Sequence, residues 1–231
     1  MRGKEDPRGG GEDMIVLGTH IFDAACWLFG LPESVYSDVR WNGNHITADD
    51  TVETTEPLGL CAGNEIFAHF RFKNGINGIF ESRCSLVPPV SDKRMGITVC
   101  GTEGSLTIRY TNDRSLRICR NFPVPTEDSN LYETAELPPM EEIPGAEPID
   151  YAAWKLDPAV YHNLYFAGNN RRAAWDLIQA IEQGREPLAG IESAVESLEM
   201  IVGVYQSALS HSMTELPLKN RLHPLKEKEN K

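Results

Sequence analysis

The order of the secondary-structure signals constrains this chain most, because short strand-like runs are grouped together between helical segments. Between residues 34 and 120, runs rich in β-branched and aromatic residues, such as EIFAHFRF and LRICR, are separated by Gly and Asn. Helical periodicity occupies about residues 12–30, 157–184 and 190–210. Strands therefore follow strands instead of alternating with helices. The sequence predicts an α+β fold with a large open, mostly antiparallel sheet and helices packed on one face.

Local signals divide the chain further. Asn74-Gly75 in FKNGIN predicts a tight hairpin, and the Pro-rich, acidic residues 121–150 predict a long surface loop. The segment TELPL near the end has a short strand-like pattern. We expect residues 1–11 to be a linker remnant, residues 12–225 a single α+β domain for substrate binding and oligomerisation, and residues 226–231 a disordered tail.

Charge and cysteine content exclude several classes of protein. The net charge of −12 over 231 residues disfavours nucleic acids and anionic membranes as partners, because both would be repelled. Five cysteines, an odd number without a CxxC pair, suggest neither a disulfide framework nor a zinc site, and we expect no bound metal. No apolar run approaches the ~18 residues of a membrane span. These features predict a soluble, cytoplasmic protein.

The first helical segment carries the side chains that bear most directly on function. It is apolar on most sides, yet it contains His20 with Asp13 and Asp23 near it in sequence. At ~100° per residue, Asp13, Val16, His20 and Asp23 fall on one stripe of a regular helix. Asp23 is three residues from His20 and is its expected orienting partner. The pair could serve proton transfer, or it could be a hydrogen-bonded pair that closes a contact between helix and sheet.

Several stretches resemble the C-terminal domain of the Gfo/Idh/MocA oxidoreductases. They are GGGEDMIVLGTHIFDAACWLFGLPESV, GTEGSL and SALSHSMTELPL, and the most specific match is the G-x-H-x-x-D pattern of Gly18, His20 and Asp23. The resemblance implies an open antiparallel sheet flanked by helices, whose free face serves assembly into a homo-oligomer. It also implies a substrate-side domain acting on sugars or cyclitols, with NAD or NADP bound mostly elsewhere and His20 taking or relaying a proton.

The sequence also departs from that family. It has no G-x-G-x-x-G turn after a strand and no Glu-Lys-Pro segment with the catalytic lysine, and Val16 stands where the family usually has Asp. We therefore expect the chain to be inactive alone and to bind no cofactor, as a fragment of an oxidoreductase or an excised domain. The alternative is a natural short protein, a non-catalytic sugar-binding or oligomerisation module; metal-assisted hydrolysis or isomerisation is a weaker third. Whether this chain is itself an enzyme stays open.

Three glycines, an arginine and a second histidine also have a functional and a structural interpretation each. Gly9, Gly10 and Gly11 could let backbone amides approach the cofactor, as the resemblance implies, or could form a hinge between domains. Arg83 could grip substrate hydroxyls or make a cross-strand ion pair, and His45 could border a sugar pocket or be an exposed loop residue.

Overall fold

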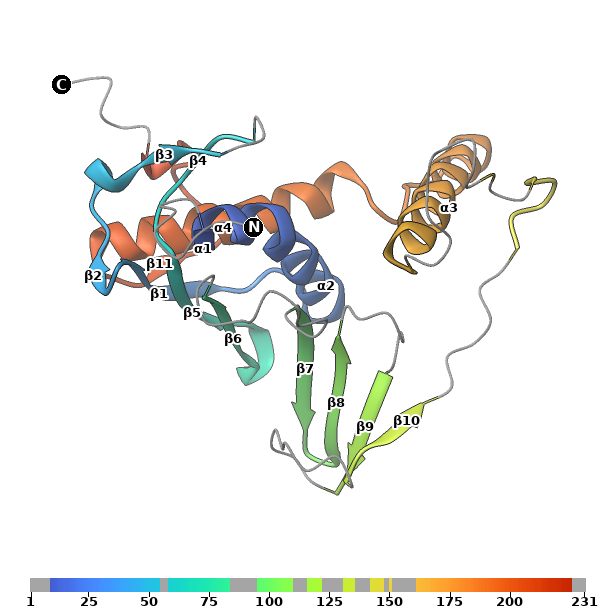
Figure 1. Ribbon diagram of the computed structural model, residues 1–231, viewed down its shortest axis with the longest axis horizontal. Coiled ribbons are helices and arrows are strands. Elements are labelled where there is room, and N and C mark those ends of the chain that lie inside the picture. The colour runs from blue at the N-terminus through green and yellow to red at the C-terminus, as the bar shows by residue number, and fades with distance from the viewer. Residues whose placement is uncertain are drawn as a thin grey trace. The chain divides into compact units, whose positions relative to one another are not determined.

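The computed structural model of the protein describes residues 9–54, 58–83, 95–109, 116–121, 131–135, 142–147, 150 and 161–225. The chain divides into two compact units (Figure 1). Unit 1 contains Met1–Ser91 and Ile191–Lys231, and unit 2 contains Asp92–Gly190. Unit 1 is therefore discontinuous in sequence, with unit 2 inserted into it.

Unit 1 is built on an antiparallel sheet with the strand order β11-β1-β5-β6. Its strands are β1 (Ser34–Trp41), β5 (Glu65–Arg71), β6 (Asn77–Arg83) and β11 (Thr214–Glu215), and the short β2 (Asn44–His45) pairs with β1. A separate pair joins β3 (Val52–Glu53) to β4 (Leu60–Cys61).

Two Asn-Gly turns set the register of this sheet. Asn74 and Gly75, with φ of 63° and 78°, connect β5 to β6, so the hairpin predicted there is confirmed. Asn42 and Gly43, with φ of 49° and 82°, connect β1 to β2 in the same way. Both central residues of a type I′ turn need positive φ, which Asn and Gly accept at low cost.

Two helices cover the inner face of the sheet. The first is α2 (Thr19–Phe29), which follows α1 (Gly9–Asp13) and a π-helical segment (Met14–Gly18) without a break. The second is α4 (Ile191–Ser210). The Ser37 amide of β1 donates to Ser207 Oγ of α4 at 2.9 Å, and Ser37 Oγ donates to the Val204 carbonyl at 2.6 Å. These bonds fix α4 against β1.

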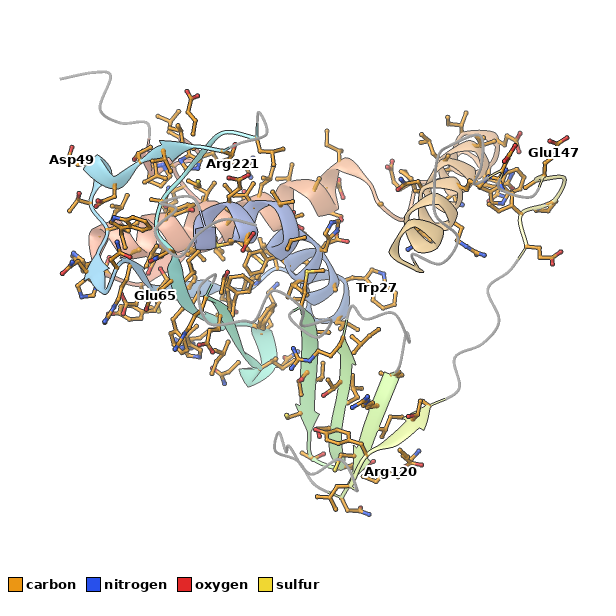
Figure 2. The ribbon with its side chains drawn as sticks, viewed as in Figure 1. Trp27, Asp49, Glu65, Arg120, Glu147 and Arg221 are labelled. Carbon is orange, nitrogen blue, oxygen red and sulfur yellow. The ribbon has the colours of Figure 1, made fainter. Side chains whose placement is uncertain are left out.

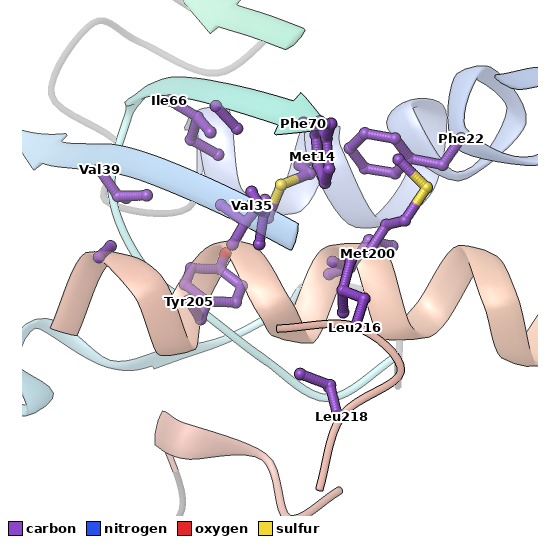
Figure 3. Packing of buried hydrophobic residues seen from close by; sticks show 14 of the residues in the cluster. Met14, Phe22, Val35, Val39, Ile66, Phe70, Met200, Tyr205, Leu216 and Leu218 are labelled. Atoms are coloured by element: carbon purple, nitrogen blue, oxygen red, sulfur yellow. The ribbon is translucent and has the colours of Figure 1, made fainter. Parts of the chain in front are cut away.

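The hydrophobic core of unit 1 lies between these helices and the inner face of the sheet (Figure 3). Alternate residues of β5 are buried, as its sequence pattern predicts for a strand with one covered face. The Phe22 ring of α2 meets Phe70 of β5 edge-on, with ring centroids 5.5 Å apart, and Phe80 of β6 at 4.6 Å. Tyr205 of α4 is fully buried, and its hydroxyl accepts a hydrogen bond from the Ala62 amide at 3.2 Å.

A buried carboxylate of α4 holds the chain segment that follows this helix, around Leu218 and Arg221. Glu199 of α4 is 5% exposed, and its Oε2 accepts the Leu218 amide at 3.1 Å while its Oε1 lies 2.7 Å from the guanidinium of Arg221. Arg221 itself reaches solvent (Figure 2). A buried carboxylate needs such partners, because without them its desolvation would destabilise the fold.

Unit 2 contains a second antiparallel sheet, in the order β10-β9-β8-β7, and the helix α3 (Tyr161–Gln183). Its strands are β7 (Gly96–Gly101), β8 (Gly104–Arg109), β9 (Leu116–Arg120) and β10 (Glu133–Ala135). Aliphatic side chains share one face of this sheet, and Thr98 and Thr107 are hydrogen-bonded on the other face at 3.0 Å. Gly184, with φ of 65°, follows α3 as the sequence predicts.

The α+β class, the antiparallel pairing, the helix over about 190–210 and the strand-like TELPL segment are confirmed. The predicted single sheet differs from the pairing found among the described strands, where β6 and β7 are edges of separate sheets. The sequence between them contains Pro88 and Pro89, which have no N–H group to donate to a strand ladder.

Two other boundaries differ from expectation. β10 lies within residues 121–150, where a long loop was predicted, because a three-residue strand carries too little pattern to be recognised. Gly9–Asp13 form α1, although residues up to 11 were predicted to be a linker. The predicted disordered tail and the start of the second predicted helical segment, near residue 157, lie outside the described residues. None of the helices in the described ranges combines the length and apolar character needed to cross a bilayer.

Candidate functional site

The predicted site lies on the helical run of α1, the π-helical segment and α2. Met14, Gly18, Phe22 and Cys26 face the core, so this run is anchored along its whole length. Gly18 lies against the Phe80 ring of β6, where an added Cβ would come within 3.1 Å of the ring. The helix therefore has a fixed rotation about its axis and presents the opposite side to solvent.

The π-helical segment corrects part of the predicted stripe. The stripe of Asp13, Val16, His20 and Asp23 assumed a regular α-helix, but Met14–Gly18 close i→i+5 instead of i→i+4 hydrogen bonds. The angular step per residue is smaller there, so Asp13 does not keep its predicted alignment with His20. His20 and Asp23 both lie in α2, where regular spacing holds.

His20 is exposed on the solvent side of α2. Among the described residues it has no hydrogen bond or ion pair. Exposed apolar residues lie one turn before it and two turns after it along the helical run: Leu17, Trp27 and Leu28 are 36%, 79% and 47% exposed. Figure 2 shows Trp27 projecting outward from α2. The imidazole is thus the polar group in an exposed apolar stripe that consists of Leu17, His20, Trp27 and Leu28.

Asp23 has a different partner from the one predicted. Ser193 Oγ of α4 donates a hydrogen bond to Asp23 Oδ1, so the carboxylate links α2 to α4. Burial, and then the nearby charges of Glu196 and Asp23, raise the pKa of the Cys26 thiol to about 12. Cys26 is therefore an unreactive core thiol, and the role of Asp23 in this structure is to join two helices.

Gly11 is required by packing. Its amide donates to the Gly63 carbonyl at 2.9 Å, and an added Cβ would lie 2.5 Å from the Ala62 carbonyl oxygen and 2.8 Å from the Tyr205 hydroxyl. Because this N–H group is already bonded within the fold, Gly11 does not fit the expected role of an amide donor to NAD(P). Gly9 and Gly10 lie in the same short helix, α1.

His45 and Arg83 stand at the two ends of one row of residues that crosses four strands of the sheet. The register aligns His45 of β2 with Arg40 of β1, Glu65 of β5 and Arg83 of β6, all on the outer face. Arg83 makes an ion pair with Glu81 of its own strand. The helices that carry His20 cover the opposite, inner face, so the structure does not bring His45 or Arg83 to His20.

His45 belongs to a polar cluster that sequence reasoning missed. Its Nδ1 lies 2.9 Å from Asp38 Oδ1, and its ring meets that of His211 with centroids 5.5 Å apart. Partial burial opposes ionisation of Asp38, but hydrogen bonds and charge from Arg40, together with His45, outweigh it and hold the pKa of Asp38 below its usual value. The Asn42-Gly43 turn was the available signal, since it brings β2 back alongside β1. No group of three or more His, Cys, Asp or Glu side chains within the described ranges is arranged to hold a metal ion.

Solved structures with a similar fold are oxidoreductases. Levoglucosan dehydrogenase in complex with NADH and levoglucosan is 18% identical with a TM-score of 0.56, and the match covers 93% of this chain and 55% of that one. The WlbA dehydrogenase from Bordetella pertussis, in complex with NADH and UDP-GlcNAcA, is 19% identical with a TM-score of 0.50, covering 91% and 47%. An oxidoreductase from Agrobacterium radiobacter with NAD+, L-tartaric acid and magnesium is 12% identical with a TM-score of 0.52, covering 87% and 48%.

These likenesses establish the fold, and the chain spans about half the length of those proteins. No match was found among curated protein sequences. Residues 2–216 match the family described as "Oxidoreductase family, C-terminal alpha/beta domain". The chain therefore belongs to the Gfo/Idh/MocA oxidoreductase family, of which it carries the C-terminal α/β domain.

Proposed function

We propose that this chain is the substrate-side part of an NAD(P)-dependent oxidoreductase that acts on a hydroxyl group of a sugar or cyclitol. Family membership supports the reaction type. Structures with a similar fold carry NADH with levoglucosan or with UDP-GlcNAcA, which supports the cofactor and the carbohydrate-like substrate class. On this proposal NAD or NADP is bound mostly by residues outside this chain, and the chain alone is inactive.

The observation that carries the proposal is the exposed position of His20 on α2, a helix that is fixed by its core contacts. His20 is exposed, and exposed apolar side chains precede it by one turn, at Leu17, and follow it by two turns, at Trp27 and Leu28. Exposed apolar surface of this kind is typical of sites that another surface covers. Since α2 is fixed by its core contacts, His20 would keep its position when that surface binds.

In the proposed reaction His20 accepts a proton from the substrate hydroxyl group. Oxidation of an alcohol carbon removes a hydride and the hydroxyl proton, and NAD(P)+ is the hydride acceptor of this enzyme class. His20 would accept the hydroxyl proton through a ring nitrogen and release it to solvent. Asp23 would act indirectly, since its bond to Ser193 fixes α2 on α4 and thereby fixes the backbone of His20.

Two observations favour the alternative in its sugar-binding form, a module that binds the carbohydrate without chemistry. Val16 cannot accept a hydrogen bond or share a proton, and Asp23 bonds to Ser193 and has no bond to His20 among the described residues. His20 then lacks an oriented carboxylate. The two proposals agree on the ligand class and differ in whether His20 is needed for turnover.

NMR of the chain with a panel of sugars and cyclitols, following both the ligand signals and the His20 ring signals, tests the substrate class. A ligand of either proposal should bind and shift the His20 ring resonances, and the His20→Gln variant should weaken binding. Turnover with NAD+ or NADP+, measured for the chain joined to a nucleotide-binding domain, separates the two. Full activity of His20→Gln would contradict the catalytic role, and the absence of any carbohydrate ligand would contradict both proposals.

We further propose that the chain forms a homo-oligomer through the outer face of β1, β5 and β6. Tyr36, Phe67 and Ile79 on that face are 52%, 43% and 68% exposed. The register places three arginines and four acids around them on the same face, which are Arg40, Arg71, Arg83, Asp38, Glu65, Glu81 and Glu215, and Glu215 is paired with Lys219. With Lys219 included, these charges cancel, whereas the whole chain carries −12. A second copy would be repelled elsewhere but not here, and its own acids could meet these arginines.

A cytoplasmic location also remains a proposal. Among the described residues, Cys26, Cys100 and Cys119 form no disulfide bond, which suits a reducing compartment.

A further inference from the structure

His69 stands at the centre of the outer face of β1, β5 and β6. The register places it directly between Tyr36 of β1 and Ile79 of β6, and Phe67 is the preceding residue of β5 on the same face. The imidazole is half-buried before any partner binds. A group in this position would lose its remaining water when the apolar side chains around it are covered.

The hydrogen bonds of Asn77 determine which ring nitrogen of His69 carries the proton. Asn77 Nδ2 donates to the Gly75 carbonyl at 2.9 Å, so the amide presents its oxygen, Oδ1, to His69 Nε2 at 3.0 Å. An oxygen acceptor requires Nε2 to be the donor. The neutral imidazole is therefore protonated at Nε2, and Nδ1 is the nitrogen that takes up the next proton.

From this geometry we propose that His69 makes the self-association of this chain pH-dependent, with the neutral imidazole compatible with the buried apolar centre and the imidazolium opposed to it. The inference rests on the proposed assembly through the outer face. A charged ring enclosed by Tyr36, Phe67 and Ile79 of two copies would lose the hydration of its newly protonated Nδ1, and neither side chain aligned with it in the register, Tyr36 or Ile79, is a carboxylate.

Other charged groups lie around His69 on both sides of the sheet, and the pH interval of the proposal is 6 to 8. On the outer face they are the seven residues around the apolar centre, which are Arg40, Arg71, Arg83, Asp38, Glu65, Glu81 and Glu215. On the far side of the sheet, α1 carries Glu12 and Asp13. Glu215 of β11 is aligned with Ser34 of β1 and is paired with Lys219 at 2.7 Å. Carboxylates and guanidinium groups ordinarily titrate outside that interval, whereas histidines change charge within it.

His45 is the competing explanation. It lies at the edge of the same face and is paired with Asp38. Its protonation would also add charge to the outer face, but at the rim, where water remains. Rim charges have small effects on association compared with desolvated ones.

Sedimentation equilibrium of the full chain at pH 8 and pH 6, at constant ionic strength, tests the inference. We expect the association constant to fall about tenfold or more at pH 6, because two imidazoles, one from each copy, must release protons when the copies associate. His69→Gln keeps a donor for Asn77 and cannot titrate, so it should associate equally at both pH values. His45→Gln should retain the pH dependence of the wild type.

The outcomes separate the inference from the assembly on which it rests. A wild-type chain that is monomeric at pH 8 overturns the assembly and, with it, the role of His69. Association that is equally tight at pH 6 and pH 8, or pH dependence abolished by His45→Gln and kept by His69→Gln, overturns the role of His69 alone. NMR titration provides a readout that needs no variant: the protonation midpoint of the His69 ring should fall as the protein concentration rises, and a midpoint independent of concentration contradicts the inference.

Discussion

Replacing Gly11 by alanine should destabilise the protein by about 2 kcal/mol. An added Cβ would lie 2.5 Å from the Ala62 carbonyl oxygen, 2.8 Å from the Tyr205 hydroxyl and 3.0 Å from the Ala62 nitrogen, all closer than ordinary contact. Overpacking of this kind costs about 1–3 kcal/mol, and displacing the Tyr205 hydroxyl from its bonds to Ala62 costs about 1 kcal/mol more. The better helix propensity of alanine returns about 0.5–1 kcal/mol.

Urea unfolding followed by circular dichroism measures this difference. Gly168→Ala is the matched control, because Gly168 also lies in a helix but an added Cβ there has no neighbour within 4 Å. The control should be stabilised by about 0.5–1 kcal/mol. If Gly11→Ala were as stable as the wild type, the contact between α1 and Ala62 would be refuted. In the chain joined to a nucleotide-binding domain, a stable Gly11→Ala variant with weakened NAD(P) affinity would restore the cofactor role that the family resemblance implies.

Four other substitutions have definite expected outcomes. His20→Asn should lower turnover of the complete enzyme by about 10²–10⁴ while the melting temperature of this chain changes little, since the exposed imidazole has no bond to another described residue. Asp23→Ala should lower the free energy of unfolding in urea by about 1–2 kcal/mol, because the hydrogen bond from Ser193 is lost, and Ser193→Ala should lower it by a similar amount. The double variant should lose less than the sum of the two single losses. The pKa of Asp38 is lowered in the folded state, so its stabilising contribution is present above about pH 4, the unfolded value, and is lost as pH falls through the folded pKa. In Asp38→Asn the free energy of unfolding in urea should therefore depend less on pH below about 4 than in the wild type.

Local chemistry explains why parts of the fold were predictable. The hairpin at Asn74-Gly75 depends on two residues that accept positive φ, and no distant contact is needed to infer it. The alternation in β5 likewise records one covered face and one open face. Both signals lie within a few neighbouring residues of the chain.

The candidate site was less predictable because its contacts join distant segments. Ser193 is 170 residues from Asp23, and nothing in the periodicity of either helix indicates the bond between them. The π-helical segment at Met14–Gly18 has the same composition as ordinary helix, so its effect on the alignment of Asp13 with His20 could not be anticipated. His20 was recognised through a motif, but its apolar surroundings are visible only in the structure.

The discontinuity of unit 1 has a consequence for synthesis on the ribosome. The inner face of β1 and β5 is covered in part by α4, yet about a hundred residues of unit 2 are translated between β6 and α4. At roughly 5–20 residues per second, Val35, Ile66 and Phe70 emerge from the ribosome about 7–34 s before Val204 and Tyr205 can pack on that face. During this interval the nascent chain exposes an uncovered apolar surface, so we expect chaperones to bind it most strongly before residue 191 has emerged.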